Sequence, residues 1–461
     1  MTTCCVLIAL SALAAPTPAN TELAAYLVEA GENNPALQAA HARWRAALAR
    51  VPQAGALDDP MFTYGQFLVS DVNRFKLGLT QKFPWFGTRR LREASAVAEA
   101  EAAFHRMVDL RNRLSMEVKN AYFDYALLGE QIRLREDQLE LLAQTEETAL
   151  SLLSAGMASD ADILKVQMAR ASMQDARDRL EDYRPALSAT LAAALGRMGG
   201  EVLPWPEDPG PAPSPPETDV AVALALAASP SLRKLDALLA SREARVELAR
   251  KQGYPDFALN VDYVSMSKPR QVRPDRPYPA SLNAARRVVN VATGTAPFDA
   301  VNAAIDAYAL GTSSDPMAYS DGGDDNLMVA LSVSVPIWRR KIRAGMEEAR
   351  NEARAVDLDR KKEALALEAA VRGALYRHED AVRRRALNED QLLPQAGQRY
   401  ESLQVAYGTA AEGVDFLDVL ASVDDMLRYE LDLAAAVRDE HRAVAELEYL
   451  LGGPWNESGG E

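Results

Sequence analysis

The second half of the chain repeats motifs of the first half in the same order. NPAL at Asn34 recurs as SPSL at Ser229, 195 residues later, and LTQKFPWF at Leu79 recurs as LSVSVPIW at Leu331, 252 residues later. The offsets differ by 57 residues, so the second half carries one insertion of about that length. This tandem duplication constrains the fold more than any other feature, because the second copy must build what the first copy builds.

Each copy reads as a helix, two strands, a very long helix and a returning helix. The copies meet at residues 197–217, where seven prolines exclude both a helix and a central strand, so we expect an extended linker. The expected first repeat spans 20–196, with strands at about 60–83 and a helical hairpin at 87–195. The expected second repeat spans 218–453, with strands at about 255–265 and 326–336, a loop insertion at 267–325 and a hairpin at 339–452. A tail follows at 454–461.

The helical segments are long enough to form coiled-coil hairpins. About 69 residues in the first arm, at about 1.5 Å each, make it roughly 100 Å long. The returning arm carries apolar or small residues spaced alternately by three and four, as a coiled-coil seam requires. Gly156 and Gly408 mark the two turns, where glycine serves by adopting a positive φ. Pro185 and Pro394 lie inside these helices and should kink them.

The strand segments alternate between apolar and polar residues. Runs of about 10 residues that are apolar on one face and small or polar on the other suit a transmembrane barrel strand. A soluble antiparallel sheet is the alternative for any single strand, but the rest of the chain reads as coiled coil and linker and offers no second layer to cover the apolar faces. Four strands are too few to close a barrel, for which about eight is the small end, so several chains must share one. The clearest apolar positions are Phe257, Leu259, Val261, Tyr263, Leu327, Val329, Leu331, Val333 and Val335.

Composition and the N-terminus place limits on the partners. A formal charge of -15 argues against a sequence-independent nucleic-acid binder, which needs a surplus of Lys and Arg. An apolar run from about Cys4 to Ala15, ending in a small-x-small cleavage site, reads as a secretory signal peptide over 1–15. The run is too short to span a membrane, which takes about 20 residues, and no other apolar run is longer. Removal of the signal would leave a chain without cysteine.

No pattern of catalytic residues is present. The four histidines are scattered, and the stretch that opens like HExxH at His378 has Val382 in its fifth place. There is no phosphate loop, no GxSxG elbow and no pair of cysteines spaced for a metal. We therefore expect neither an enzyme nor a bound cofactor or metal.

A group of acidic residues lies near the second hairpin turn. If several chains share one axis, each carboxylate recurs around that axis, and a ring of carboxylates at a constriction favours cations. The alternative is that these are ordinary solvated charges of a coiled coil. Asp160 and Asp162 occupy the comparable turn of the first repeat. The group comprises Glu412, Asp415, Asp418, Asp424 and Asp425.

The chain resembles the TolC-type outer-membrane efflux factors over almost its whole length, from about Asn34 to Gly452. The resemblance is carried by NPAL, VPQAGALDDP at Val51, QKFPWFGTRRLR, SAGMASDADIL at Ser154 and AYGTAAEGVDFLDVL at Ala406. Within the family, VPQAGALDDP and FPWFG look most like the CusC and CzcC cation-efflux branch. The implied fold is mostly helical: tandem-repeat coiled-coil hairpins plus four strands per chain that contribute to a trimeric, twelve-stranded outer-membrane barrel.

The resemblance also implies a function, a location and partners. A homotrimer would sit in outer-membrane lipid of a Gram-negative bacterium with a helical tunnel in the periplasm. It would pass substrates, heavy-metal cations or drugs, from an inner-membrane pump of the RND or ABC type and a periplasmic adaptor (membrane fusion protein) to the exterior. The alternatives are a type I secretion duct for polypeptides and a periplasmic coiled-coil scaffold without a pore. Nucleic acid is not an expected partner.

Three groups of residues take roles from this resemblance. The family has an aspartate gate in a DVLDA-like stretch; here the stretch reads DVLA, so Asp418 is the expected periplasmic gate residue, with Asp415 second. The expected adaptor contacts at the hairpin tips are Gly156, Met157, Ala158, Ser159, Gly408, Thr409 and Ala410. The aromatic residues expected at the membrane interface are Phe83, Trp85, Phe86 and Trp338; for Trp85, simple packing at the strand-helix joint is the alternative.

Overall fold

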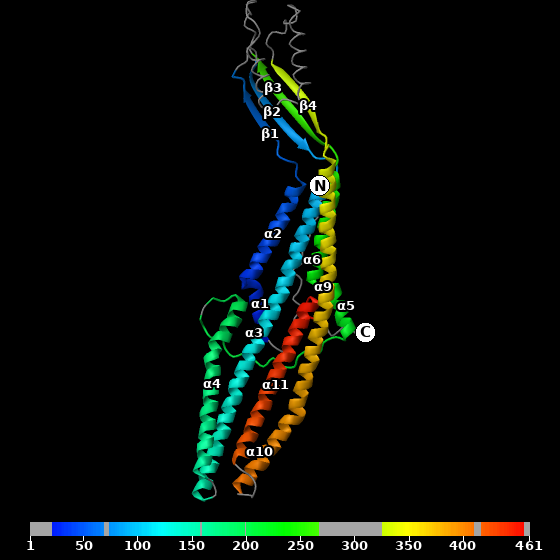
Figure 1. Ribbon diagram of the computed structural model, residues 1–461. Coiled ribbons are helices and arrows are strands. Elements are labelled where there is room, and N and C mark those ends of the chain that lie inside the picture. The colour runs from blue at the N-terminus through cyan, green and yellow to red at the C-terminus, as the bar shows by residue number, and fades with distance from the viewer. Residues whose placement is uncertain are drawn as a thin grey trace, which may run out of the picture. The chain divides into compact units, whose positions relative to one another are not determined.

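The computed structural model describes residues 21–68, 73–156, 159–198, 200–266, 325–409 and 416–455 (Figure 1). In these residues the fold is mostly helical with four antiparallel strands, which confirms the helical hairpins and the four strands of the expected fold class. The expected signal peptide, most of the insertion and tail, and four of the candidate residues (Met157, Ala158, Ala410 and Asp415) lie outside the described residues. The elements are α1 (Thr21–Asn33), α2 (Pro35–Gly55), β1 (Met61–Gln66), β2 (Asn73–Phe83), α3 (Thr88–Ser154), α4 (Asp160–Leu195), α5 (Thr218–Ala228), α6 (Pro230–Lys251), β3 (Asp256–Met266), β4 (Asn326–Ser334), α9 (Arg339–Leu387), a π-helix (Asn388–Leu392), α10 (Leu393–Gly408) and α11 (Phe416–Leu451).

The chain divides into two compact units, and the division does not follow the duplication. The helical unit comprises Met1–Val51, Ala96–Arg242 and Glu352–Glu461, and the sheet unit comprises Pro52–Ser95 and Glu243–Asn351. Each unit takes segments from both repeats. The duplication therefore pairs equivalent elements inside each unit rather than making two separate domains.

The sheet unit contains one antiparallel sheet with the strand order β1-β2-β3-β4 (Figure 1). β1 and β2 come from the first repeat, β3 and β4 from the second, and β1 and β4 form the two edges. The register sets Leu79 opposite Val261, and Val261 opposite Val329. Because side chains alternate along a strand, this register brings the apolar positions of all strands to one face of the sheet.

A sharp joint follows β2. β2 ends at Phe83, Pro84 cannot donate to a strand ladder, and Gly87 adopts a φ of 83° before α3 begins at Thr88. The backbone N–H of Trp85 donates to Asp256 Oδ1 at 2.9 Å, which satisfies the donor where the ladder stops. The short connection between β2 and α3 therefore follows from Pro84 and Gly87.

The helical unit has two equivalent apolar clusters, one for each repeat. The first is built by α1, α3 and α4 with Leu203 of the linker, and the second by α5, α6, α9 and α11. Val118 and Val371, which are 253 positions apart, are both fully buried in the centre of their clusters. The equivalence extends to six pairs at this spacing: Leu114/Leu367, Val118/Val371, Ala121/Ala374, Tyr122/Leu375, Tyr125/His378 and Leu128/Ala381, all buried.

A glycine closes the returning helix of each repeat against the start of the same repeat. Gly196 has a φ of 80°, and a Cβ there would lie 2.9 Å from the carbonyl oxygen of Asn33; Gly452 has a φ of 85°, and a Cβ there would lie 2.9 Å from the carbonyl oxygen of Ala228. Both positions need glycine for the left-handed backbone and for the close approach.

Pro394 and Pro185, the two prolines expected to kink the hairpin helices, are accommodated differently. Upstream of Pro394 the helix widens into the π-helix, and the N–H of Leu393 bonds to the carbonyl of Asn388. Such a π-turn relieves the clash between a proline ring and the preceding turn. α4 continues as an α-helix through Pro185. Among the described residues, none of the helices has the length and apolar character of a membrane span.

Candidate functional site

The two hairpin ends share one apolar cluster. Phe416 of α11 is buried with Ala149 of α3 and Ile163 of α4, and its ring lies 5.2 Å from the ring of Tyr407 on α10. The ends of both repeats therefore pack on one another inside the helical unit, as seen at the bottom of Figure 1. The side chains around this cluster form one surface with contributions from both repeats.

The α3–α4 turn is closed by a capping box. Gly156 adopts a φ of 78°, and Ser159 and Asp162 cap each other's backbone at the start of α4. Asp162 also accepts from Lys165 Nζ at 3.1 Å. Partial burial pushes the pKa of Asp162 upwards, but the bonds from Ser159 and Lys165 outweigh it and hold the pKa below its ordinary value. Asp162 therefore stabilises the turn.

The α10–α11 end differs from the expectation for its glycine. Gly408 is the last residue of α10 and does not adopt a positive φ, so the prediction for this glycine is wrong, whereas that for Gly156 is correct. Thr409 ends the helix instead, since both its N–H and its hydroxyl donate to the carbonyl of Val405. Gly408 and Thr409 are exposed, as are Gly156 and Ser159.

The structure separates the acidic residues that the sequence grouped together. Asp418 lies exposed in the first turn of α11. Asp425, about two turns further along α11, pairs with Arg399 of α10 at 2.6 Å and with Arg428 at 3.8 Å. Burial and the neighbouring Asp425 raise the pKa of Asp424. Of the group in the described residues, Asp418 is the one closest to the hairpin end.

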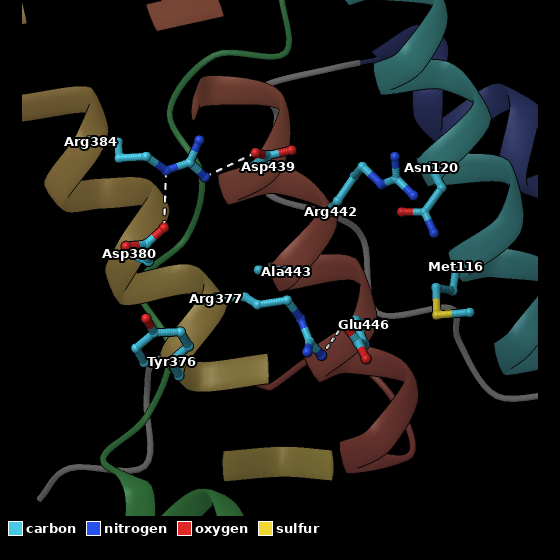
Figure 2. A pocket seen from close by; sticks show the side chains of 10 residues that line it. All are labelled: Met116, Asn120, Tyr376, Arg377, Asp380, Arg384, Asp439, Arg442, Ala443 and Glu446. Atoms are coloured by element: carbon cyan, nitrogen blue, oxygen red, sulfur yellow. Dashed lines mark hydrogen bonds and ion pairs between the residues drawn. The ribbon is translucent and has the colours of Figure 1, made fainter. Parts of the chain in front are cut away.

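A cavity of about 490 Å³ lies between α3, α9 and α11, and no pattern in the sequence predicted it (Figure 2). Its charged side chains are matched in pairs. Arg377 of α9 pairs with Glu446 of α11 at 2.7 Å, and Arg384 pairs with Asp439 at 2.9 Å. The charges of the lining therefore balance, with three arginines against two aspartates and one glutamate. The lining residues are Met116, Asn120, Tyr376, Arg377, Asp380, Arg384, Asp439, Arg442, Ala443 and Glu446.

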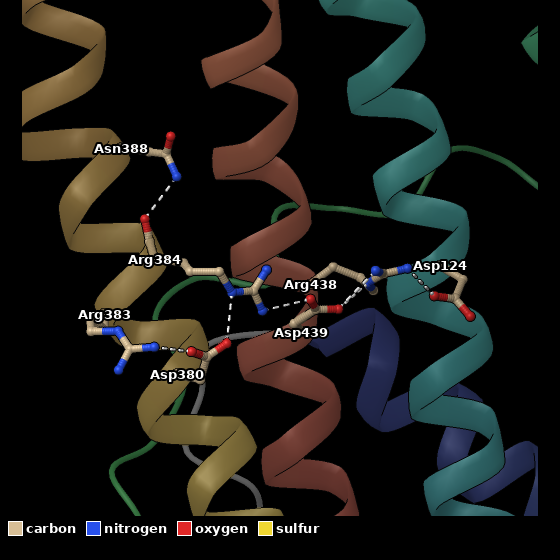
Figure 3. Close-up of polar contacts among 7 residues, drawn as sticks. All are labelled: Asp124, Asp380, Arg383, Arg384, Asn388, Arg438 and Asp439. Carbon is tan, nitrogen blue, oxygen red and sulfur yellow. Dashed lines mark hydrogen bonds and ion pairs between the residues drawn. The ribbon is translucent and has the colours of Figure 1, made fainter.

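The same ion pairs continue into a network that joins three helices (Figure 3). Asp124 of α3 accepts from Arg442 at 3.0 Å and from Arg438 at 3.3 Å, both on α11. Arg384 then links Asp439 of α11 to Asp380 on its own helix. Partly exposed networks of this kind fix the register of neighbouring helices more than they add stability.

The aromatic residues at the joint fall into two classes. Trp85 is half-buried and stacks on Tyr254, with ring centroids 5.1 Å apart, and on Phe257, at 5.8 Å. Phe86 and Trp338, by contrast, are 77% and 73% exposed. Trp85 therefore packs at the strand-helix joint, while the rings of Phe86 and Trp338 are exposed.

The described residues offer no cluster of three or more His, Cys, Asp or Glu side chains that could hold a metal ion. His378 and His441 are both buried in the helical unit, where burial lowers their pKa values. His441 contacts the carbonyl of Gly210 at 3.1 Å and stacks on Phe123. These histidines serve packing.

Comparisons with known proteins show which families and folds this chain resembles. Residues 26–197 match the family model described as outer membrane efflux protein. No curated protein sequence matches the chain. Solved structures with the same fold include the outer membrane protein VceC from Vibrio cholerae, with a TM-score of 0.71 at 17% identity over 94% of this chain and 96% of that chain.

Two further structures extend the likeness. CusC has a TM-score of 0.71 at 14% identity, covering 94% of this chain and 93% of that chain. The MtrE outer membrane channel of Neisseria gonorrhoeae, in its open state, has a TM-score of 0.68 at 16% identity, covering 94% of this chain and 89% of that chain. The resemblance expected from the sequence is thereby confirmed.

Proposed function

We infer that this chain, whose residues 26–197 match the outer membrane efflux protein family and whose fold resembles that of outer-membrane channels along most of its length, is the exit duct of a tripartite efflux system. Channels of this family are passive trimers of the Gram-negative outer membrane, with a periplasmic helical tunnel, and work with an adaptor and an inner-membrane pump. The observation that carries the proposal is the sheet, which has one apolar face, one polar face and two open edges.

The two faces of the sheet suit a barrel wall between lipid and water. Leu79, Val261 and Val329 lie in one cross-strand row on the apolar face. The next row, Thr80, Asn260 and Ala330, lies on the other face, where Thr80 donates to Asn260 at 2.8 Å. An outer-membrane barrel alternates apolar and polar residues in this way along every strand.

The open edges support a homotrimer. Among the described strands, β1 and β4 each have one unpaired side, and such edges invite pairing with another chain. Large apolar side chains are also exposed on the helices that would meet in a ring, on α4 and on α9 with α10. Head-to-tail contact between two different faces closes a ring of identical chains. These side chains are Leu164, Met168 and Tyr183 on α4, and Leu365, Tyr376, Leu387 and Val405 on α9 and α10.

The hairpin ends are the proposed docking surface for the periplasmic adaptor. Gly156, Ser159, Gly408 and Thr409 are exposed there, and Met157, Ala158 and Ala410 belong to the same turns in the sequence. The shared apolar cluster beneath them gives the surface a fixed base. The pump, of the RND or ABC type, would act through this adaptor.

Asp418 is the proposed periplasmic gate residue, with Asp415 beside it in the sequence. Its exposure at the start of α11 supports the assignment, because a threefold ring of such carboxylates would attract cations and narrow the entrance. The exposed aromatic residues Phe86 and Trp338, with Phe83, are proposed to lie at the membrane interface. Trp85 would support them from within the joint.

The cargo follows less directly from the chain. The sequence resemblance to the cation-efflux branch, together with the likeness to CusC in fold, supports export of heavy-metal cations or drugs. A duct need not bind its cargo tightly, so the described residues require no metal cluster. Export of polypeptides is the second candidate, and block of the open channel by small cations would argue against it.

The first experiment determines the oligomer mass of the purified protein in detergent and then its conductance in planar bilayers. A trimer with discrete openings is expected, and a monomer without conductance would favour the periplasmic scaffold.

A matched pair of cysteine variants tests the orientation of the sheet. Thr80→Cys should react with a charged thiol reagent added to the channel, whereas Leu79→Cys, its neighbour on the apolar face, should not. Equal reaction at both positions would contradict the barrel.

A further inference from the structure

One ion pair lies on the polar face of the sheet, between the two repeats. Lys76 Nζ of β2 lies 2.9 Å from Asp262 Oδ2 of β3. The Asp262 side chain is only 13% exposed and that of Lys76 is 36% exposed, although the described strands form a single layer. The pair crosses the β2–β3 ladder diagonally, because Asp262 faces Gly78 and Lys76 faces Val264.

A glycine makes room for the carboxylate. A Cβ at Gly78 would lie 2.7 Å from Asp262 Oδ1 and 3.6 Å from Cβ of Thr63 on β1. Any other residue at position 78 would displace the carboxylate from its place beside Lys76. Gly65 stands opposite Lys76 on β1, so the lysine side chain also has a flat neighbour. Asp262 and Lys76 therefore occupy a notch that is built by two glycines.

Few other charges share this face. Along the four described strands, Met61–Gln66, Asn73–Phe83, Asp256–Met266 and Asn326–Ser334, the charged residues are Arg74, Lys76, Lys82, Asp256 and Asp262. Lys82 faces Ala258 across the ladder. Asp256, the first residue of β3, accepts the N–H of Trp85 at 2.9 Å, so Asp262 is the carboxylate in the interior of these strands, and it is paired with Lys76.

We propose that Lys76 and Asp262 form a ring of neutralised charge pairs in the lumen of the outer-membrane barrel, in which Lys76 masks a carboxylate that would otherwise bind cations. The inference rests on the proposed function, since it requires the polar face to line a shared pore. In that pore the notch recurs in every subunit at one level. Removal of Lys76 would convert it to a ring of bare carboxylates, and such a ring attracts cations and holds multivalent ones.

The effect of the mask on permeation follows from its position. A neutral ring neither repels nor retains charged cargo, so the exit would pass cations and anions with little preference at this level. A bare Asp262 ring would hold a multivalent cation in the exit path and slow the flow of others. We therefore assign charge neutrality at the exit to the Lys76–Asp262 pair, separate from any selectivity at the periplasmic end.

The test uses single-channel recording in a salt gradient, with wild type, Lys76→Met, Asp262→Asn and the exchange variant Lys76→Asp/Asp262→Lys. Lys76→Met should raise the cation-to-anion permeability ratio several-fold and introduce block by added Mg²⁺. Asp262→Asn should shift the ratio towards anions without Mg²⁺ block. The exchange variant should restore wild-type behaviour, because it rebuilds the pair in the opposite direction and shows that the site still folds.

Lys82→Met is the matched control. It removes the same charge from the same face but exposes no carboxylate, so it should shift the permeability ratio only slightly and leave the channel insensitive to Mg²⁺. Equal Mg²⁺ block in Lys82→Met and Lys76→Met would overturn the mask, as would single variants that conduct with an unchanged ratio. A wild-type protein that gives no conductance would instead contradict the proposed function itself.

Discussion

The two repeats place their buried side chains at equivalent positions but fill them with different chemistry. At one such pair, Tyr125 of the first repeat donates its hydroxyl to the carbonyl of Leu203 at 2.7 Å and accepts from Arg184 at 3.2 Å. Its equivalent is His378, which is also buried and whose Nε2 has no hydrogen-bond partner in the part of the chain that the structure describes. Duplication has therefore kept which positions are buried, while the polar contacts of each copy are its own.

The linker explains part of this difference. It packs on the first repeat, where Trp205 stacks on Tyr125 with ring centroids 4.9 Å apart and lies under Arg184 at 4.0 Å. A Cβ at Gly129 would lie 3.0 Å from the Trp205 ring, so glycine admits the indole. The equivalent position in the second repeat, 253 residues later, is Val382, which is exposed. The Trp205 part of the linker therefore covers this surface of the first repeat, while its Gly210 part contacts His441 of the second repeat.

The largest expected effect tests what the repeats share. Gly196→Ala and Gly452→Ala each place a Cβ on a left-handed residue and against a backbone carbonyl. Each should lower the free energy of unfolding by more than about 2 kcal/mol, measured as the loss of helical circular dichroism in detergent on heating or in denaturant. Gly397→Ala, inside α10 with no atom within 4 Å of the added Cβ, is the control and should be neutral or stabilising. A large loss for only one of the two variants would show that the joints are not equivalent.

A smaller effect tests where the repeats differ. Tyr125→Phe leaves the carbonyl of Leu203 and the guanidinium of Arg184 without their shared partner, and should cost about 1–2 kcal/mol. His378→Leu removes a buried ring nitrogen that has no hydrogen bond, and should be neutral or stabilising. The same unfolding measurement compares them. Equal costs for both variants would contradict the interpretation that only the first position carries a necessary hydrogen bond.

Much of the fold could be predicted because it depends on local patterns. The alternation of apolar residues predicted four strands, and the register in the structure does align those residues on one face. The proline and glycine after Phe83 predicted the joint, and α3 begins at Thr88. The φ of Gly408 was predicted wrongly: Gly408 is the last residue of α10 and does not adopt a positive φ, and the N–H and hydroxyl of Thr409 both bond to the carbonyl of Val405.

The site was harder to predict because its contacts join residues that are far apart in sequence. Asp124 and Arg442 are 318 positions apart, and neither carries a local signal that would pair them. The acidic residues near the second turn looked alike in the sequence, yet Asp425 is paired with Arg399 of α10. The roles of Asp418 and of the hairpin tips in gating and docking remain predictions that functional measurements must test.

The buried histidines predict a dependence on pH that the first repeat's Tyr125 cannot show. Burial lowers the pKa of His378, near Glu440 and Glu379, and that of His441, near Glu440, Arg385 and Asp208, from an ordinary value of 6.5. Below pH 6.5 the histidines bind protons in the unfolded chain but not in the folded chain. The stability that is fully present above this pH is therefore lost as the pH falls. The unfolding midpoint should therefore drop between about pH 7 and about pH 5.

The His378→Leu variant measures the share of one histidine in this loss. Its unfolding midpoint should fall less steeply with acid than that of wild type, while the uncharged control Gly397→Ala should leave the slope unchanged. A slope that is the same in all three proteins would show that the acid sensitivity comes from the carboxylates rather than from this buried ring.

The smallest effect on stability separates two aspartates that occupy equivalent places, 256 residues apart. Asp162 caps α4 and binds Lys165, whereas the second repeat has Asp415 in place of Ser159 and Ala421 in place of Lys165. Asp162→Ala should therefore cost about 1 kcal/mol of helix stability and leave conductance unchanged. Asp418→Ala, by contrast, should raise the leak conductance and weaken block by multivalent cations, because it removes a ring of negative charge at the entrance. Bilayer recordings of the two variants decide between the roles. If Asp418→Ala changes neither leak nor block, the second aspartate is a helix-end charge like the first, and the gate lies elsewhere.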